Sequence, residues 1–131
     1  MLFYGKILDL KGAPFEANPE IYNKMKEGIK SCDINYFHGE ILSIIENKIH
    51  TPIDFISFSD ILSYFNEEVE TIYLQKIKEK LSPKALTVHR YYLHINYGLN
   101  IEGYKLITKN FQDLINKEKT QIYTIDVYQR D

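Results

Sequence analysis

Two apolar runs separated by an amphipathic segment dominate the pattern of hydrophobic and polar positions along this chain. Residues 53–60 form an apolar run that follows Pro52 and ends in Ser59 and Asp60, which is typical of a buried parallel strand. Residues 85–93 are β-branched and aromatic and predict a second strand. Between them, Asn66 precedes a run of acids, and apolar residues then recur at helical spacing until just before Pro83. The pattern therefore predicts a strand, a helix over 66–81 and an adjacent parallel strand.

The rest of the chain predicts shorter elements around this unit. Asn18, Pro19 and Glu20 are typical of a helix start. Residues 1–17 predict an N-terminal arm, and 18–131 one domain. The other expected elements are a short strand at 33–39, a short helix from Glu40 to about Asn47, an amphipathic helix over 101–115, and a final antiparallel or edge strand at 120–128. Alternating strands and helices predict an α/β fold with a mostly parallel sheet.

Composition narrows the classes of function. The chain has 131 residues, including eleven Tyr and seven Phe, which suffices for one domain with a real core. A formal net charge of −2 argues against nucleic-acid binding, since that needs a concentrated basic surface. The one cysteine, Cys32, excludes an internal disulfide and suits a reducing compartment. We find no signal peptide and no run long enough to span a membrane, so we expect a cytoplasmic protein.

Three polar clusters follow predicted strands, at the edge where open α/β sheets bind ligands. They are His38-Gly39-Glu40, Ser59-Asp60 and His89-Arg90-Tyr91. Each has an ordinary structural explanation as well: a helix start, a helix cap and a surface-exposed strand end. Their expected position on one rim favours a binding site. The four histidines have no metal-ligand spacing, so no metal site is predicted.

These residues resemble a known superfamily. The order is Gly39-Glu40, then Asp54-Phe55-Ile56 through Ser59-Asp60-Ile61-Leu62 to Tyr64, then Leu81-Ser82-Pro83-Lys84-Ala85 before a strand reaching Arg90-Tyr91. It resembles the C-terminal half of a class I S-adenosylmethionine-dependent transferase, with a partial Rossmann-like sheet. Within that superfamily it is most similar to the family containing S-adenosylmethionine:diacylglycerol 3-amino-3-carboxypropyl transferase. The similarity extends over about residues 18 to 93.

The resemblance implies roles for particular residues. Gly39 and Glu40 would lie near the adenine of S-adenosylmethionine, and Ser59, Asp60 and Ile61 would border the cofactor and the reacting centre. Tyr64, Arg90 and Tyr91 would face the acceptor, and Asp60 and Tyr64 are the implied catalytic residues.

One feature of the superfamily is missing, since the chain contains no Gly-x-Gly loop of the kind that holds the cofactor. The first two strands of the sheet would then be lacking. We therefore expect a truncated or split relative of a transferase of methyl or 3-amino-3-carboxypropyl groups, inactive alone and completed by self-association or a complementary N-terminal half. The alternatives are a non-catalytic binding or structural module and a complete small transferase in which residues 1–17 substitute for a strand.

Overall fold

The computed structural model describes residues 17–92, 94–95, 98–118 and 122–131, which form parts of two units, Met1–Tyr36 and Phe37–Asp131. The first unit contains helix α1 (Pro19–Ile29), and the Asn18 side chain caps it by accepting from the Glu20 amide at 2.9 Å. The predicted helix start is therefore confirmed. None of the residues of α1 is buried. Apart from Ala17, the predicted arm at 1–17 lies outside the described residues.

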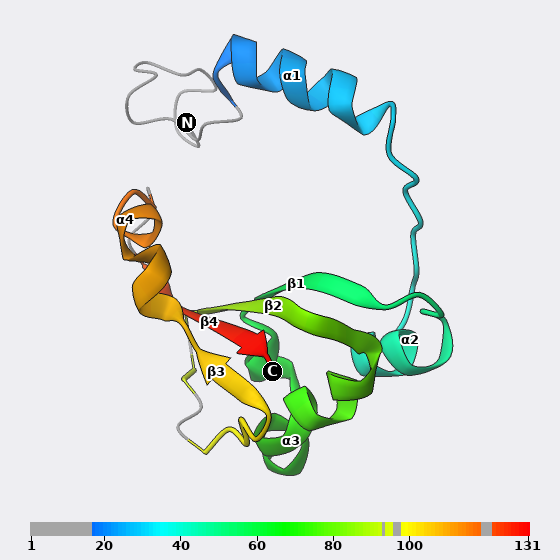
Figure 1. Ribbon diagram of the computed structural model, residues 1–131, viewed down its shortest axis with the longest axis vertical. Coiled ribbons are helices and arrows are strands. Elements are labelled where there is room, and N and C mark those ends of the chain that lie inside the picture. Colours follow the sequence, from blue (N-terminus) through cyan, green and yellow to red (C-terminus); the bar gives the residue numbers. More distant parts are fainter. Residues whose placement is uncertain (1–16, 93, 96–97, 119–121) are drawn as a thin grey trace. The chain divides into compact units, whose positions relative to one another are not determined.

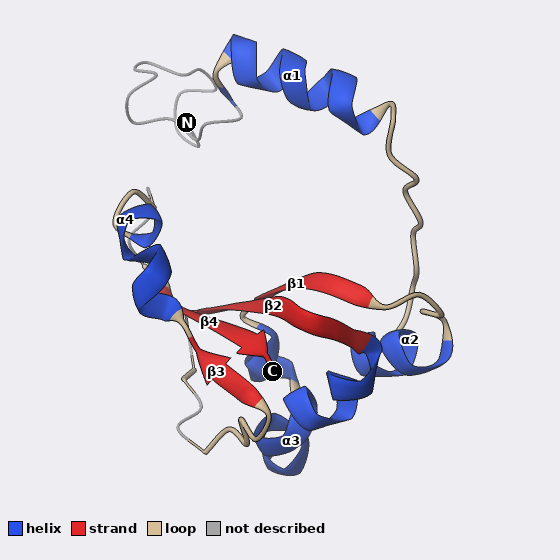
Figure 2. Cartoon of the chain, viewed as in Figure 1, coloured by secondary structure: helices blue, strands red, loops and turns tan. Residues whose placement is uncertain are grey.

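The second unit alternates short helices and strands along the chain (Figures 1 and 2). In order, its elements are α2 (Ile41–Asn47), β1 (Ile53–Ser59), the 3-10 helix η2 (Ile61–Tyr64), α3 (Glu67–Ile77), the 3-10 helix η3 (Lys78–Lys80), β2 (Leu81–Tyr91), β3 (Tyr104–Leu106), the 3-10 helix η4 (Thr108–Phe111), α4 (Gln112–Ile115) and β4 (Thr124–Arg130). The α/β class predicted from the sequence is confirmed.

The four strands form one mixed sheet in the order β1-β2-β4-β3. β1 and β2 are parallel neighbours, with Phe58 opposite His89 and Ser59 opposite Arg90. β4 is antiparallel to both β2 and β3. The prediction of a parallel pair is confirmed, but the prediction of a mostly parallel sheet is wrong. The prediction that the first strand is buried is also wrong, because β1 is an outer strand of the sheet and only Phe58 within it is buried. A parallel neighbour needs a crossover such as α3, whereas β4 inserts between β2 and β3 in the opposite direction.

Helix α3 makes the crossover, as its sequence predicts. Asn66 caps it by accepting from the Val69 amide at 2.9 Å, and its first turn carries three acids that complement the helix dipole. Its buried face consists of Tyr73, Leu74 and Ile77. The final predicted strand is also confirmed as antiparallel, at Thr124–Arg130, although it lies inside the sheet.

Two predicted elements are wrong. Residues 33–39 form no strand, because the alternation of apolar and polar positions there finds no neighbouring strand to pair with among the described residues. The four-stranded sheet therefore does not contain a strand ending at Gly39. The helix expected over 101–115 is replaced by β3, η4 and the single turn α4. Gly103, with a φ of +78°, breaks the helical pattern just before β3.

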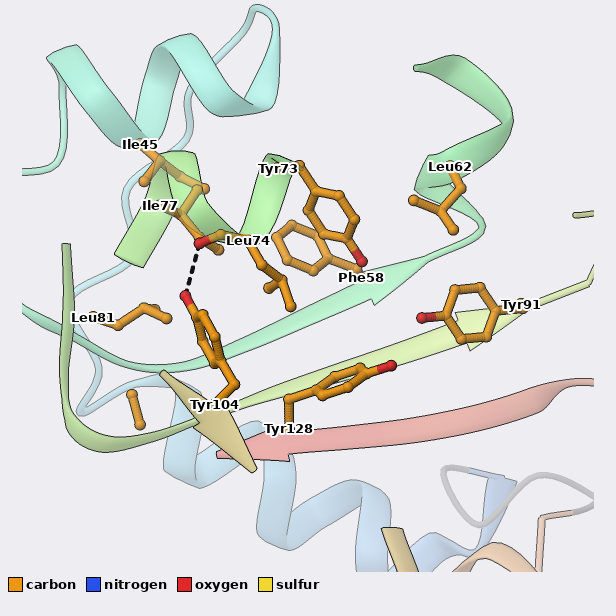
Figure 3. Close-up of a cluster of buried hydrophobic side chains, with 11 residues drawn as sticks. Ile45, Phe58, Leu62, Tyr73, Leu74, Ile77, Leu81, Tyr91, Tyr104 and Tyr128 are labelled. Atoms are coloured by element: carbon orange, nitrogen blue, oxygen red, sulfur yellow. Dashed lines mark hydrogen bonds between the residues drawn. The ribbon is translucent and has the colours of Figure 1, made fainter. Parts of the chain in front are cut away.

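The hydrophobic core lies between one face of the sheet and the helices α2, η2 and α3 (Figure 3). It consists of Ile45, Phe58, Leu62, Tyr73, Leu74, Ile77, Leu81, Ala85, Tyr91, Tyr104 and Tyr128. The Tyr104 hydroxyl donates to the Leu74 carbonyl at 2.7 Å and so ties β3 to α3. In the part of the chain that the structure describes, no helix has the length and apolar character to cross a membrane.

Candidate functional site

Asp60 holds the turn at the carboxyl end of β1. Its backbone amide donates to the Arg90 carbonyl at 2.8 Å, and its Oδ1 accepts from the Tyr92 amide at 3.3 Å. Its φ of 53° and ψ of 26° lie in the left-handed region, which costs a non-glycine residue about 1–2 kcal/mol, although aspartate enters it more readily than most. Residues in such sparsely populated conformations, held in place by surrounding hydrogen bonds, cluster at functional sites.

Arg90 lies beside this turn. The strand register sets it opposite Ser59, on the face of the sheet directed away from the core. Its guanidinium carbon lies 5.4 Å from the ring centroid of Tyr123, a cation–π contact. Tyr123 also meets Tyr92 edge-on at a centroid distance of 6.1 Å. The Nε atom of Arg90 is buried and has no hydrogen-bond partner among the described residues. Ser59, Asp60, Arg90, Tyr92 and Tyr123 form what we call the strand-end rim.

Tyr91 and Tyr92 differ in accessibility. Tyr91 is only 3% exposed and belongs to the core, whereas Tyr92 is 55% exposed next to the rim. Successive residues of a strand point to opposite faces, so the side chain at the rim is that of Tyr92. That Tyr91 faces an acceptor stays a prediction.

Gly39 and Glu40 have a structural role at the start of α2. The two carboxylate oxygens of Glu40 accept from the amides of Leu42 at 2.9 Å and Ser43 at 2.7 Å. Gly39 has a φ of +149°, a backbone conformation that favours glycine. The carboxylate of Glu40 therefore acts as a helix cap, while part of the residue also lines the groove described next.

An open groove of about 550 Å³ runs between α2 and the segment from η2 to α3. It brings together Glu40 and Tyr64, two of the residues implied by the sequence resemblance. The lining residues are Glu40, Leu42, Ser43, Glu46, Tyr64, Phe65, Asn66, Val69 and Lys76. Its volume lies within the range of small-molecule sites, and its lining combines an apolar part with charges of both signs. Helix η2 joins the groove to the rim, since Asp60 precedes the helix and Tyr64 ends it.

Behind the rim, polar side chains of the core bond to one another. The Tyr73 hydroxyl lies 2.5 Å from Nδ1 of His89, and Nε2 of His89 lies 2.9 Å from the Thr87 hydroxyl. Burial lowers the pKa of His89 to about 3, so the ring is neutral near pH 7. Burial also raises the pKa of Tyr73 and of Tyr91. In Figure 3 the hydroxyls of Tyr73, Tyr91 and Tyr128 point toward one another. This cluster is sealed from solvent and holds the core together.

Histidine and acidic side chains do not gather into a metal site in the described part of the chain, where no group of three or more such ligands occurs. His94 lies near Glu70 instead, with 2.6 Å between Nε2 and Oε1.

Comparisons with protein-family models, with curated proteins and with solved structures give no match to this chain.

The structure brings some of the sequence-predicted residues together and separates others. Ser59, Asp60 and Arg90 meet at the rim, and Glu40 and Tyr64 meet at the groove. Ile61 packs against the core at the start of η2. Sequence reasoning missed Tyr92, Tyr123 and Lys76. Tyr92 could have been found, because it comes two residues after Arg90 and so continues the same face of the predicted strand. Nothing in the local sequence linked Tyr123 to Arg90.

Proposed function

We propose that this chain is a relative of the C-terminal half of S-adenosylmethionine-dependent transferases, and that it contributes part of a ligand site without completing it. The proposal rests mainly on one observation. The parallel pair β1–β2, joined by α3, ends in a constrained aspartate whose turn is bonded to the neighbouring strand. Ligands of open α/β sheets bind outside the carboxyl ends of such strands. Its position agrees with the role that the sequence resemblance implies for Asp60.

The residues present fit S-adenosylmethionine in part. An aspartate at the rim suits a ligand that carries a sulfonium, an ammonium and ribose hydroxyls, and the apolar lining of the groove by Leu42, Phe65 and Val69 suits a flat base. Glu40 is less suited, because backbone amides of α2 engage both of its carboxylate oxygens. The described residues supply no glycine-rich turn for the amino-acid end of the cofactor. We therefore expect weak binding by the isolated chain.

The proposed chemistry assigns roles to this chain's own side chains. The cofactor would supply a carbon activated by a sulfonium, either a methyl or a 3-amino-3-carboxypropyl group. Asp60 would orient the ligand and accept the proton that the acceptor loses. Arg90 offers a positive charge stacked on Tyr123, which suits an acidic or phosphate-bearing acceptor. Tyr64 is 85% exposed beside the groove and has room to contact the acceptor.

Titration of ¹⁵N-labelled protein with S-adenosylhomocysteine tests this proposal. We expect amide shifts at residues 59–64 and along the groove, with a dissociation constant weaker than about 10 μM. Asp60→Ala should remove the response, whereas Asp54→Ala, which changes another acid of the same segment, should leave it intact.

Two outcomes would contradict the proposal. An absence of shifts up to about 5 mM ligand, beyond the weak affinities of small-ligand sites, would favour a non-catalytic module. A dissociation constant of about 10 μM or tighter, roughly −7 kcal/mol, would favour a complete small transferase.

A further inference from the structure

The two outer strands of the sheet differ in how their edges are protected. β3 is three residues long, and Lys105 within it pairs with Asp131 at 3.1 Å. Short length and an edge lysine are both features that prevent a strand from pairing with another chain. β1 is seven residues long, carries no lysine or proline, and borders β2 on one side only (Figure 1). Among the described residues, β1 is therefore the unprotected edge.

The hydrogen-bond direction along β1 follows from one contact at its end. The amide of Asp60 donates to the Arg90 carbonyl of β2. In a parallel ladder, alternate residues direct both backbone groups to the same neighbour, so Ile56 and Phe58 also face β2. The amides and carbonyls of Phe55, Ser57 and Ser59 then face the outer edge, where no described residue pairs with them. All three residues are exposed, and Phe55 is 57% exposed.

We propose that this edge of β1 pairs antiparallel with β1 of a second copy of the chain. A two-fold axis makes such pairing antiparallel. When the axis passes through Ile56, the strands Ile53–Ser59 overlap along their whole length. Phe55 then lies opposite Ser57 of the second copy, and each of the two residues has its amide and carbonyl directed outward. The register satisfies the outward backbone groups of both strands.

Overlap selects this register over its neighbours. With the axis at Ile56, all seven residues of Ile53–Ser59 lie opposite a residue of the second copy, and two Ile56 side chains meet across the axis. With the axis shifted to Phe55 or to Ser57, only five residues of each strand would overlap. In the fully overlapped register Asp54 lies opposite Phe58 of the second copy, so no like charges face each other directly. Because both copies present the same outward backbone groups in this register, the edge of β1 complements itself, which is the reason to assign it to a second copy.

The apolar surface next to the edge would become continuous in this dimer. Phe55 pairs with Leu86 of β2, and Ser57 pairs with Val88, so these side chains share the face of the sheet directed away from the core. Leu86 and Val88 are half-buried. Joining two copies at β1 would bring both Phe55 rings onto one extended face of the joined sheet, where they would cover part of each other's apolar surface.

Substitutions at Ser57 test the proposal in the full-length protein. Sedimentation velocity at about 100 μM should show a dimer for the wild type, a concentration that detects weak specific interfaces. Ser57→Pro removes an outward amide without removing a bond to β2, and proline is tolerated on edge strands with that orientation. It should give a monomer with unchanged circular dichroism. Ser57→Ala keeps the amide and should remain dimeric.

Amide hydrogen exchange provides the second readout, which does not depend on how Ser57→Pro folds. The amides of Phe55, Ser57 and Ser59 should exchange at least about tenfold more slowly in the dimer than at a concentration low enough to dissociate it. The amides of Ile56 and Phe58 should be protected at both concentrations. A monomeric wild type, a dimeric well-folded Ser57→Pro variant, or outward amides whose protection does not depend on concentration would overturn the proposal. The last result would indicate that a segment of the same chain covers the edge.

Discussion

The Tyr73 hydroxyl lies 2.5 Å from Nδ1 of His89, and this contact joins the crossover helix α3 to the central strand β2 inside the core. Both side chains are at most 1% exposed. A neutral imidazole has one donor and one acceptor nitrogen, and each nitrogen of His89 faces a hydroxyl, which can serve in either role. The core of this small α/β unit is therefore held by a satisfied polar cluster as well as by apolar contacts.

Removing the Tyr73 hydroxyl should destabilise the protein. Tyr73→Phe leaves a ring nitrogen of His89 buried without its partner, so we expect the free energy of unfolding to fall by about 1–3 kcal/mol. Urea unfolding followed by circular dichroism measures this. Tyr22→Phe is the matched control, because Tyr22 is 56% exposed on α1, and it should change the free energy by less than about 0.5 kcal/mol. Equal effects of the two substitutions would contradict the role of the buried contact.

Acid should destabilise the protein through His89. Burial lowers the pKa of His89 to about 3 from its ordinary 6.5, so below pH 6.5 the unfolded chain binds a proton that the folded chain does not. This stabilising contribution is complete above pH 6.5 and is lost as the pH falls toward 3, at about 1.4 kcal/mol per pH unit. Unfolding free energies measured between pH 6 and pH 4 should have this slope, and the slope should vanish toward pH 7. It should disappear in His89→Asn but persist in His50→Asn, whose side chain is exposed.

Glycine should be more stable than the native lysine at position 84. Lys84 lies within β2, in the stretch where the register with β1 shifts, and its φ is 66°. Glycine removes a left-handed penalty of about 1–2 kcal/mol. Glycine also has more conformational entropy than lysine in the unfolded chain, which lowers the free energy of unfolding by about 0.5–1 kcal/mol. Lys84→Gly should therefore raise the free energy of unfolding by about 0.5 kcal/mol.

Two further variants at Lys84 separate backbone from side chain. Lys84→Ala keeps a Cβ atom and should leave stability nearly unchanged, whereas the β-branched Lys84→Val should lower it. Chemical unfolding of the three variants gives the order of their free energies of unfolding. A destabilised Lys84→Gly variant would show that the lysine side chain, rather than the backbone conformation, determines stability at this position.

The bond between Tyr104 and Leu74 should hold β3 in place. Tyr104→Phe removes a buried hydroxyl that donates at 2.7 Å, and we expect a loss of about 1 kcal/mol. The amides of β3 should also exchange faster, because this strand is only three residues long. Tyr36→Phe, at a residue that is 90% exposed, should change neither quantity. Unchanged exchange in β3 would show that pairing with β4 alone fixes this strand.

The segment from β1 to β2 could be predicted from the sequence because its signals are local. The apolar run at 53–58, the Asn66 cap and the stop before Pro83 each act within a few residues, and the structure has the strand, helix and strand that they indicate. The turn at Asp60 follows from the same pattern, since the polar residues come directly after the apolar run. That part of the candidate site therefore lies where the sequence sets it, at the carboxyl end of β1.

Tertiary structure decided the features that depend on distant partners. Residues 33–39 alternate like a strand but have no described neighbour to pair with, whereas Tyr104–Leu106 becomes a strand because β4, later in the chain, lies beside it. The same holds for the rim. Whether Tyr91 or Tyr92 reaches the surface depends on which face of β2 meets α3, and the contact of Arg90 with Tyr123 depends on β4. The local sequence sets the conformation of each segment and its caps. The order of the strands, and the face of each strand that is buried, depend on pairing between residues far apart in the chain, which local patterns do not encode.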